Sequence, residues 1–221
     1  MTTKDAVKLI FKNEQRKSKH SKEKSDQTKK DFDIYFSKWE QVEGHLDLDF
    51  TIGERNDGTY IIFESTKSYM DWIVNFLFKP IFGMHKGFWA GYHINEKLIK
   101  EKLKEYEAQK LYILGHSQGA AYALIATKRE IETCCMARKP FDHIEAVVTG
   151  GPRVFAIGQI FGQPSIDLIH NGNDIVTKLP PKWLWGYRHV GQVMHIGKPK
   201  KWWKISFKDH DISEYLKNME E

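Results

Sequence analysis

A short motif in the middle of the chain has the residue types and the spacing of a nucleophilic serine site. Residues 115–119 read Gly-His-Ser-Gln-Gly, between an apolar run at 111–114 and an alanine-rich run at 120–126. Strand, G-x-S-x-G and helix in this order are typical of a nucleophile elbow, in which the serine sits on a strained turn and the glycines let neighbouring backbone pass closely. The free N–H groups at the start of such a helix face the position of a developing oxyanion. The motif therefore predicts a serine hydrolase with Ser117 as the nucleophile.

A triad also needs an acid, which follows a strand further along the chain. The apolar run at 166–170 predicts that strand, and Asp174 lies in the loop just beyond it. Asp167 is the alternative acid, but it lies inside the strand. The Asn-Gly-Asn-Asp loop that holds Asp174 is also common in ordinary turns. Local residues therefore favour Asp174 over Asp167 without excluding a plain turn.

The base must be a histidine, and two of the ten histidines follow Asp174 outside the predicted strands. His189 precedes the last predicted strand at 192–196. His210 follows that strand and opens a helical run at 212–216, which is where a triad histidine belongs. The order of the elements favours His210 as the base, with His189 as the alternative.

The elements that would position these side chains alternate between strands and helices. The pattern predicts helices at 88–106 and 118–138 and strands at 111–114, 146–149, 166–170 and 192–196. This alternation predicts an α/β fold, with a mainly parallel central sheet and helices on both faces. Upstream, extended runs at 45–50 and 59–63 flank a turn at 56–58 and predict an N-terminal β-hairpin.

The charge of the chain is concentrated at its beginning. Of 34 basic and 29 acidic residues, ten and five lie within residues 1–31, which leaves 24 of each in the remainder. The 221 residues are enough for one α/β domain with a sizeable core. We therefore expect a basic N-terminal helix or tail over 1–31 and an α/β-hydrolase domain over 32–221. The neutral body argues against a nucleic-acid-binding face.

Within the basic segment, residues 1–13 predict a short amphipathic helix, and residues 14–31 are almost wholly polar. The polar part is interpreted as a solvated linker, with transient contact to an anionic lipid surface as the alternative. On this interpretation, deletion of residues 1–31 keeps activity on a soluble short-chain ester.

Targeting signals and cysteine usage point to a reducing compartment. Residues 1–8 lack the apolar region of a secretory signal. The longest apolar stretch, at 69–84, is interrupted by charged residues and proline, so it does not predict a membrane span. Cys134 and Cys135 are adjacent, which suits two small, partly buried side chains rather than a disulfide framework or a zinc site. These features predict a cytoplasmic protein without a transmembrane segment.

Seven landmarks in order make residues 61–215 resemble the class 3 lipase family, which has the α/β-hydrolase fold. The segments that resemble family motifs are 61–66 with 71–72, 85–88, 115–119, 149–154, 173–181, 186–191, and 209–215 with Asp209-His210 and Tyr215. The resemblance implies Ser117 as nucleophile, Asp174 as acid and His210 as base, and it places His189 in a structural motif.

The resemblance also implies an oxyanion hole formed by Thr66 and the backbone N–H of Gln118. This chain departs from the family at Glu64 and Ser65, where the family has arginine and glycine. The resemblance therefore does not determine the backbone path beside Thr66. In the family the segment after the oxyanion residue forms a lid, here residues 69–78. A plain amphipathic core helix is the alternative for that segment.

The implied activity is hydrolysis of carboxylic esters of lipids through an acyl-enzyme, as in triacylglycerol lipases, with no metal or organic cofactor. The partner is then a lipid or other ester substrate, with transient contact to a lipid surface. One alternative is a phospholipase A1, a monoacylglycerol lipase or a small-ester esterase. A second alternative is a non-catalytic relative that binds lipid or a partner protein, which the change at Glu64 and Ser65 supports.

Overall fold

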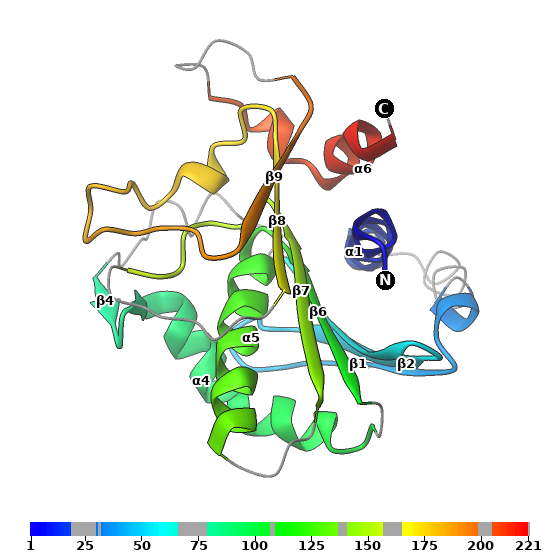
Figure 1. Cartoon of the computed structure of the whole chain (residues 1–221). Coiled ribbons are helices and arrows are strands. Elements are labelled where there is room, and N and C mark those ends of the chain that lie inside the picture. Colours follow the sequence, from blue (N-terminus) through cyan, green and yellow to red (C-terminus); the bar gives the residue numbers. More distant parts are fainter. Residues whose placement is uncertain are drawn as a thin grey trace.

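The protein is described by a computed structural model that covers residues 1–18, 30, 32–65, 79–106, 109–136, 141–156, 165–198 and 205–220. Its centre is a seven-stranded sheet in the order β1-β2-β3-β6-β7-β8-β9 (Figure 1). The strands are β1 (Lys38–Val42), β2 (Phe50–Arg55), β3 (Gly58–Phe63), β6 (Lys110–His116), β7 (His143–Thr149), β8 (Ser165–Asn171) and β9 (Gln192–Ile196).

The direction of pairing changes at β3. The pairs β1–β2 and β2–β3 are antiparallel, whereas β3–β6, β6–β7, β7–β8 and β8–β9 are all parallel. Parallel neighbours need crossover connections, which α4 (Lys86–Leu103) and α5 (Gln118–Met136) provide. All the parallel strands therefore end at one edge of the sheet, and the loops at that edge can bring distant residues together.

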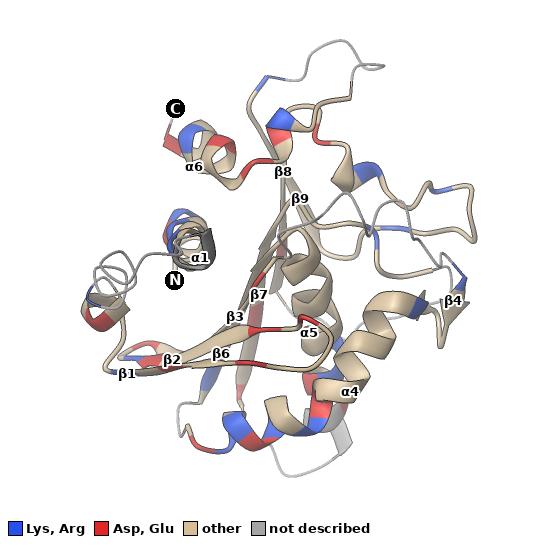
Figure 2. Ribbon diagram, turned by 180° about the vertical axis from the view of Figure 1, so that it is seen from behind, with Lys and Arg blue, Asp and Glu red and all other residues tan. Residues whose placement is uncertain are grey.

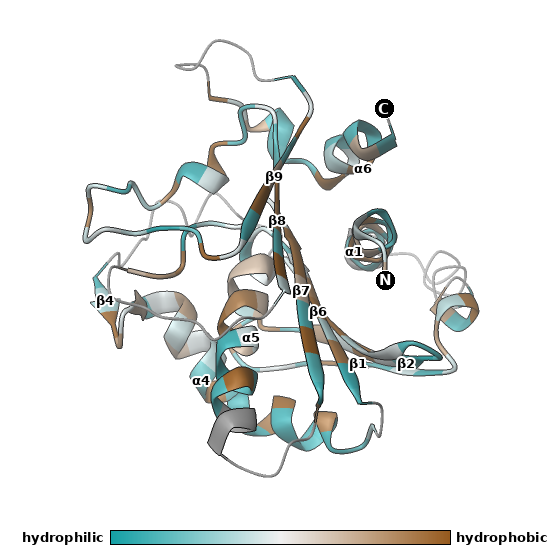
Figure 3. Ribbon diagram, viewed as in Figure 1, coloured by the Kyte–Doolittle hydropathy of each residue, from teal (hydrophilic) through white to brown (hydrophobic). Residues whose placement is uncertain are grey.

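Helices cover both faces of the sheet (Figure 1). α4 and α5 pack on one face, and α1 (Thr3–Ser18) and α6 (Ile212–Glu220) pack on the other. Alternate residues of β3 point to opposite cores: Ile61 and Phe63 belong to the α4–α5 side, and Tyr60 and Ile62 to the α1–α6 side. Apolar residues are accordingly concentrated on the central strands (Figure 3). The predicted mainly parallel sheet with helices on both faces is confirmed.

The hairpin that precedes the parallel strands joins β2 to β3 through a two-residue turn at Asn56 and Asp57. The prediction of a strand at 45–50 was wrong, because β2 begins only at Phe50. Leu46 and Asp47 both have a φ of 56°, a left-handed conformation that interrupts extended backbone. The alternation of apolar and acidic residues at 45–50 therefore belongs to a turn.

The first part of the basic segment is folded against the sheet. α1 buries Ala6, Val7, Leu9 and Ile10 in the core that it shares with α6. The buried Asn13 accepts a hydrogen bond of 2.8 Å from the hydroxyl of Thr51 on β2. Over Thr3–Ser18 the segment is thus part of the packed body and not a solvated tail. The domain boundary at residues 31 and 32 stays a prediction.

A small two-stranded sheet lies beside α4. β4 (Pro80–Ile81) pairs antiparallel with β5 (Met84–His85), and α4 begins directly after it. The His85 ring caps α4 by accepting a hydrogen bond from the Phe88 amide at 3.5 Å. In the described part of the chain, every helix is too short or too polar to cross a lipid bilayer.

Candidate active site

Ser117 occupies the single position between the end of β6 and the start of α5, and its φ is 55°. Both flanking glycines are required by close backbone contacts. A Cβ on Gly115 would lie 2.4 Å from the backbone of Gly119, and a Cβ on Gly119 would lie 2.4 Å from the carbonyl oxygen of Phe63. The tight turn places the Ser117 hydroxyl at the carboxyl edge of the sheet, beside the end of β3.

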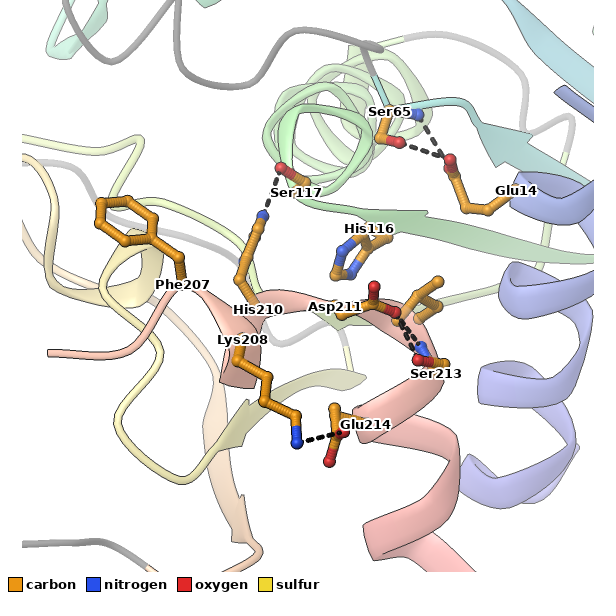
Figure 4. A pocket seen from close by; sticks show the side chains of 11 residues that line it. Glu14, Ser65, His116, Ser117, Phe207, Lys208, His210, Asp211, Ser213 and Glu214 are labelled. Carbon is orange, nitrogen blue, oxygen red and sulfur yellow. Dashed lines mark hydrogen bonds and ion pairs between the residues drawn. The ribbon is translucent and has the colours of Figure 1, made fainter. Parts of the chain in front are cut away.

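Three side chains from separate loops meet at this hydroxyl. The Oγ of Ser117 lies 2.8 Å from Nε2 of His210, and Nδ1 of His210 lies 2.9 Å from Oδ2 of Asp174. All three side chains are buried. Because a carboxylate only accepts hydrogen bonds, Nδ1 of His210 donates to Asp174, and Nε2 is left to accept the serine proton. Figure 4 shows the His210 ring pointing toward Ser117.

The Asp174 carboxylate is held by further donors. The backbone N–H of Val176, in the short helix η1 (Val176–Lys178), donates to Oδ1 at 2.8 Å. The hydroxyl of Tyr215 on α6 donates to Oδ2 at 2.6 Å. Burial, and next the charge of Asp174, raise the pKa of Tyr215 well above its usual value, so this hydroxyl stays a donor. The sequence placed Tyr215 in a helical run and in the landmark at 209–215, but it did not predict this hydrogen bond to Asp174.

His116 lies beside the base without competing with it. Its ring stacks on that of His210 with centroids 4.8 Å apart, and its Nδ1 lies 2.9 Å from Oγ1 of Thr149. Burial, and next the charge of His210, lower the pKa of His116 well below 6.5. A neutral His116 ring therefore packs against His210 and restricts its orientation.

The two alternative triad residues lie elsewhere. The Nε2 of His189 donates to the carbonyl oxygen of Thr177 at 2.8 Å, and burial lowers its pKa to about 4. Its ring contacts that of His170, with centroids 4.6 Å apart. Asp167 on β8 accepts a hydrogen bond of 3.3 Å from the hydroxyl of Thr3. Neither side chain belongs to the group around Ser117.

Of the two predicted oxyanion donors, the structure describes Gln118. The N–H of Gln118 is the first in α5, so no acceptor exists for it within the helix, while its side-chain amide donates to the Tyr122 hydroxyl at 3.1 Å. Thr66 and the segment 69–78 lie outside the described residues.

The departure from the family at Glu64 and Ser65 is accommodated by hydrogen bonds. The amide of Glu64 donates to the Asp49 carbonyl at 3.0 Å, and its buried carboxylate accepts from Gln41 at 3.2 Å. The amide of Ser65 donates to Oε1 of Glu14 on α1 at 2.8 Å, and the Ser65 hydroxyl donates to Oε2 of the same carboxylate.

A pocket of about 430 Å³ opens at Ser117. Figure 4 shows its lining, in which most side chains are polar or charged. The lining residues are Glu14, Ser65, His116, Ser117, Phe207, Lys208, His210, Asp211, Ile212, Ser213 and Glu214. Two internal contacts order the rim: Asp211 accepts hydrogen bonds from the amide and hydroxyl of Ser213, and Lys208 lies 3.4 Å from Glu214.

Comparison with known proteins decides the family. The profile of the family described as Lipase (class 3) matches residues 60–183, more than half of the chain. The chain belongs to the class 3 lipases. The matched range contains Ser117 and Asp174 and ends before His210.

The similar proteins are fungal lipases. The chain is 26% identical to a lipase of Rhizomucor miehei over 153 residues, which is 63% of this chain and 42% of that protein. It is 30% identical to a lipase of Rhizopus niveus over 152 residues, 60% of this chain and 37% of that protein. The chain thus spans about two fifths of the length of these curated relatives. The solved structure of lipase II from Rhizopus niveus superposes with a TM-score of 0.63 at 19% identity, covering 89% of this chain and 82% of that one. This likeness confirms the predicted α/β-hydrolase fold.

Proposed function

We propose that this class 3 lipase hydrolyses carboxylic esters of lipids through an acyl-enzyme on Ser117. The observation that carries the proposal is the unbroken chain of hydrogen bonds from Ser117 Oγ through His210 to Asp174, with distances of 2.8 and 2.9 Å. The similar fungal proteins are lipases, which supports the proposal.

The geometry suits the following steps. Oγ of Ser117 attacks the ester carbonyl while Nε2 of His210 takes its proton. Asp174 holds the imidazole in the required tautomer and stabilises the imidazolium. The N–H of Gln118 and, as the family resemblance implies, Thr66 bind the negative oxygen of the tetrahedral intermediate. The alcohol then leaves with the proton from His210, and water, deprotonated by the same histidine, releases the carboxylic acid.

A fluorophosphonate probe tests the nucleophile directly. We expect covalent labelling of the parent at Ser117, no labelling of Ser117→Ala, and very slow labelling of His210→Ala. Thermal unfolding of each variant serves as the control for folding. A parent protein that is folded but inert to the probe and to short-chain p-nitrophenyl esters contradicts the proposal and favours a non-catalytic relative.

The polar lining of the pocket favours a second candidate function, hydrolysis of lipid esters that carry a polar group. Charged or hydroxyl-bearing side chains such as Glu14, Lys208, Asp211 and Ser213 surround the space next to Ser117. This lining suits an ester that carries a polar group, as in a monoacylglycerol or a phospholipid, better than a triacylglycerol. Comparing acid release from triolein emulsion, monoolein and phosphatidylcholine tests the order. Faster hydrolysis of triolein contradicts it.

The cytoplasmic location stays a prediction.

A further inference from the structure

Residues 32–221 contain 24 basic and 24 acidic residues, but the two kinds of charge are unevenly distributed along the sequence. Residues 175–208, which run between Asp174 and Asp209, contain eight Lys or Arg and no Asp or Glu. Residues 79–95 and 150–156 contain no acidic residue either. The absence of carboxylates from three separate segments matters only if the segments adjoin in space.

These segments do lie side by side. Phe155 forms bridges with Met84 on one side and with Arg188 on the other, and the Arg188 amide donates to the Phe155 carbonyl at 2.9 Å. The ring of Tyr187 lies 6.0 Å from that of His85. Figure 1 shows β4 close to the loop that contains these C-terminal residues. One continuous surface is therefore built from sequence without acidic side chains.

Large aromatic side chains project from this surface into solvent. Trp183 is 83% exposed, Phe82 is 69% exposed and Trp185 is 47% exposed. Phe82 also contacts the ring of Trp89, with centroids 5.1 Å apart, which links the β4–β5 turn to α4. We use the name tryptophan face for Lys79, Phe82, Lys182, Trp183, Trp185 and Arg188.

The basic members of the tryptophan face are exposed as well. Lys79, Lys182 and Arg188 are all exposed, and neither Lys79 nor Lys182 forms an ion pair with a carboxylate of the described residues. Figure 2 shows blue residues without red ones on the loop segments beside β4. The positive charges of Lys79 and Lys182 therefore face solvent, with no ion-pair partner among the residues that the structure describes.

Exposed tryptophan with lysine and arginine is the composition that suits an anionic lipid interface. Tryptophan rings are enriched at the headgroup level of membranes, because one end is apolar and the other carries an N–H donor. Basic residues gain attraction from anionic headgroups within a Debye length of the surface. Nucleic acid or an acidic protein would use the charge, but neither needs tryptophan at the tips of exposed loops.

We propose that the tryptophan face docks the protein onto anionic lipid surfaces. The inference rests on the proposed function, which places a lipid ester at Ser117. Trp183 and Trp185 follow the triad acid Asp174 in the sequence, beyond the short helix η1, so the tryptophan face is joined to the site through that segment. This assigns lipid contact to the tryptophan face rather than to the basic residues within 1–31.

The test is co-sedimentation of the full chain with phosphatidylcholine vesicles, with and without phosphatidylglycerol. All variants carry Ser117→Ala, so vesicles stay intact and binding is independent of hydrolysis. Replacing Trp183 and Trp185 by alanine should lower binding to the anionic vesicles about 10-fold or more. Replacing Lys79 and Lys182 by glutamine should lower it roughly 25-fold at low salt, and the effect should shrink as salt rises.

Matched controls use residues outside the tryptophan face. Ile34→Ala removes an apolar side chain that is 81% exposed. Lys110→Gln removes an exposed charge at the first residue of β6, the end of the strand away from Ser117. Both should bind vesicles like the parent. A further variant replaces Lys19, Lys22, Lys24 and Lys29 by glutamine.

The proposal is overturned if both tryptophan-face variants still bind vesicles while the variant without the lysines at 19–29 does not. Absence of vesicle binding in the Ser117→Ala parent also overturns it, as does a change of oligomeric state in the tryptophan variant without a change in binding. Failure of the proposed function is distinguishable, because it shows as absent fluorophosphonate labelling of the unmutated protein.

Discussion

Glu14 on α1 accepts hydrogen bonds from both the amide and the hydroxyl of Ser65, the last described residue after β3. Both residues line the pocket at Ser117 (Figure 4). The family resemblance gives glycine at position 65, so the serine hydroxyl adds a second donor for the same carboxylate. Hydrogen bonds to an ionised group are stronger than neutral ones. The first helix of the chain thus fixes the backbone that leads to the predicted oxyanion residue.

Glu14→Ala should therefore lower kcat on a soluble ester by about 10- to 100-fold, because small displacements of catalytic donors are costly. Glu14→Gln should stay within roughly 3-fold of the parent, since the amide can accept from the Ser65 N–H and donate to its hydroxyl. Asn13→Ala is the matched control: it removes the bond to Thr51 and should lower stability without lowering kcat. Equal kcat for Glu14→Ala and the parent would exclude this positioning role.

Deletion of the N-terminal segment should unfold the protein. The charge distribution alone predicted that a protein without residues 1–31 keeps its activity, but Val7, Leu9 and Ile10 are fully buried. Burial of each such side chain contributes about 1.5–3 kcal/mol, so losing three removes an amount comparable to the total stability of a domain. Circular dichroism of the truncated protein should show no cooperative melting. A truncated protein that melts like the parent would contradict this.

The strands and the triad loops were predictable because they depend on local patterns. The apolar runs before Ser117 and Asp174 mark buried parallel strands, and a glycine-flanked serine after such a run restricts the backbone strongly. The contact of Glu14 with Ser65 was not predictable, because it joins residues 51 positions apart. The sequence predicted an amphipathic helix at 1–13 but not its packing on the sheet, because its apolar stripe is short and the rest of α1 is polar or charged.

Substitution of His210 should affect catalysis, whereas substitution of His189 should affect stability. His210→Ala should reduce kcat by about 10⁴-fold or more, as removal of one triad member generally does. His189→Ala should leave kcat nearly unchanged and cost about 1–3 kcal/mol of stability, because it loses a hydrogen bond to the Thr177 carbonyl. Steady-state kinetics and urea unfolding measure the two effects. The reverse pattern would assign the base to His189.

Tyr215→Phe isolates one donor to the triad acid. The ring remains packed, and only the 2.6 Å hydrogen bond to Asp174 is lost. We expect a loss of about 1–2 kcal/mol in stability and a fall of up to about 10-fold in kcat, because Asp174 holds His210 less firmly. Tyr122→Phe is the matched control, since Tyr122 is also buried and its hydroxyl bonds only to the Gln118 side chain among the described contacts. An equal loss of kcat in both variants would argue against a specific role for Tyr215.

Acid should destabilise the fold through buried neutral histidines. Burial lowers the pKa of His85 and of His189 to about 4 and that of His170 to about 3. An unfolded histidine titrates near 6.5, so between pH 6.5 and these values the unfolded chain binds more protons. Stability is therefore complete above about pH 6.5 and falls as the pH decreases toward 4.

His85→Asn tests this pH dependence one histidine at a time. Asparagine keeps a side-chain acceptor for the first turn of α4 but cannot be protonated. His85 alone should account for about 3 kcal/mol of the loss between pH 7 and pH 4, so the variant should lose less stability over that range. Urea unfolding at several pH values measures it, with the exposed His45→Asn as the control that should match the parent. A parent whose stability is the same at pH 7 and pH 4.5 would show that these rings gain protons without unfolding.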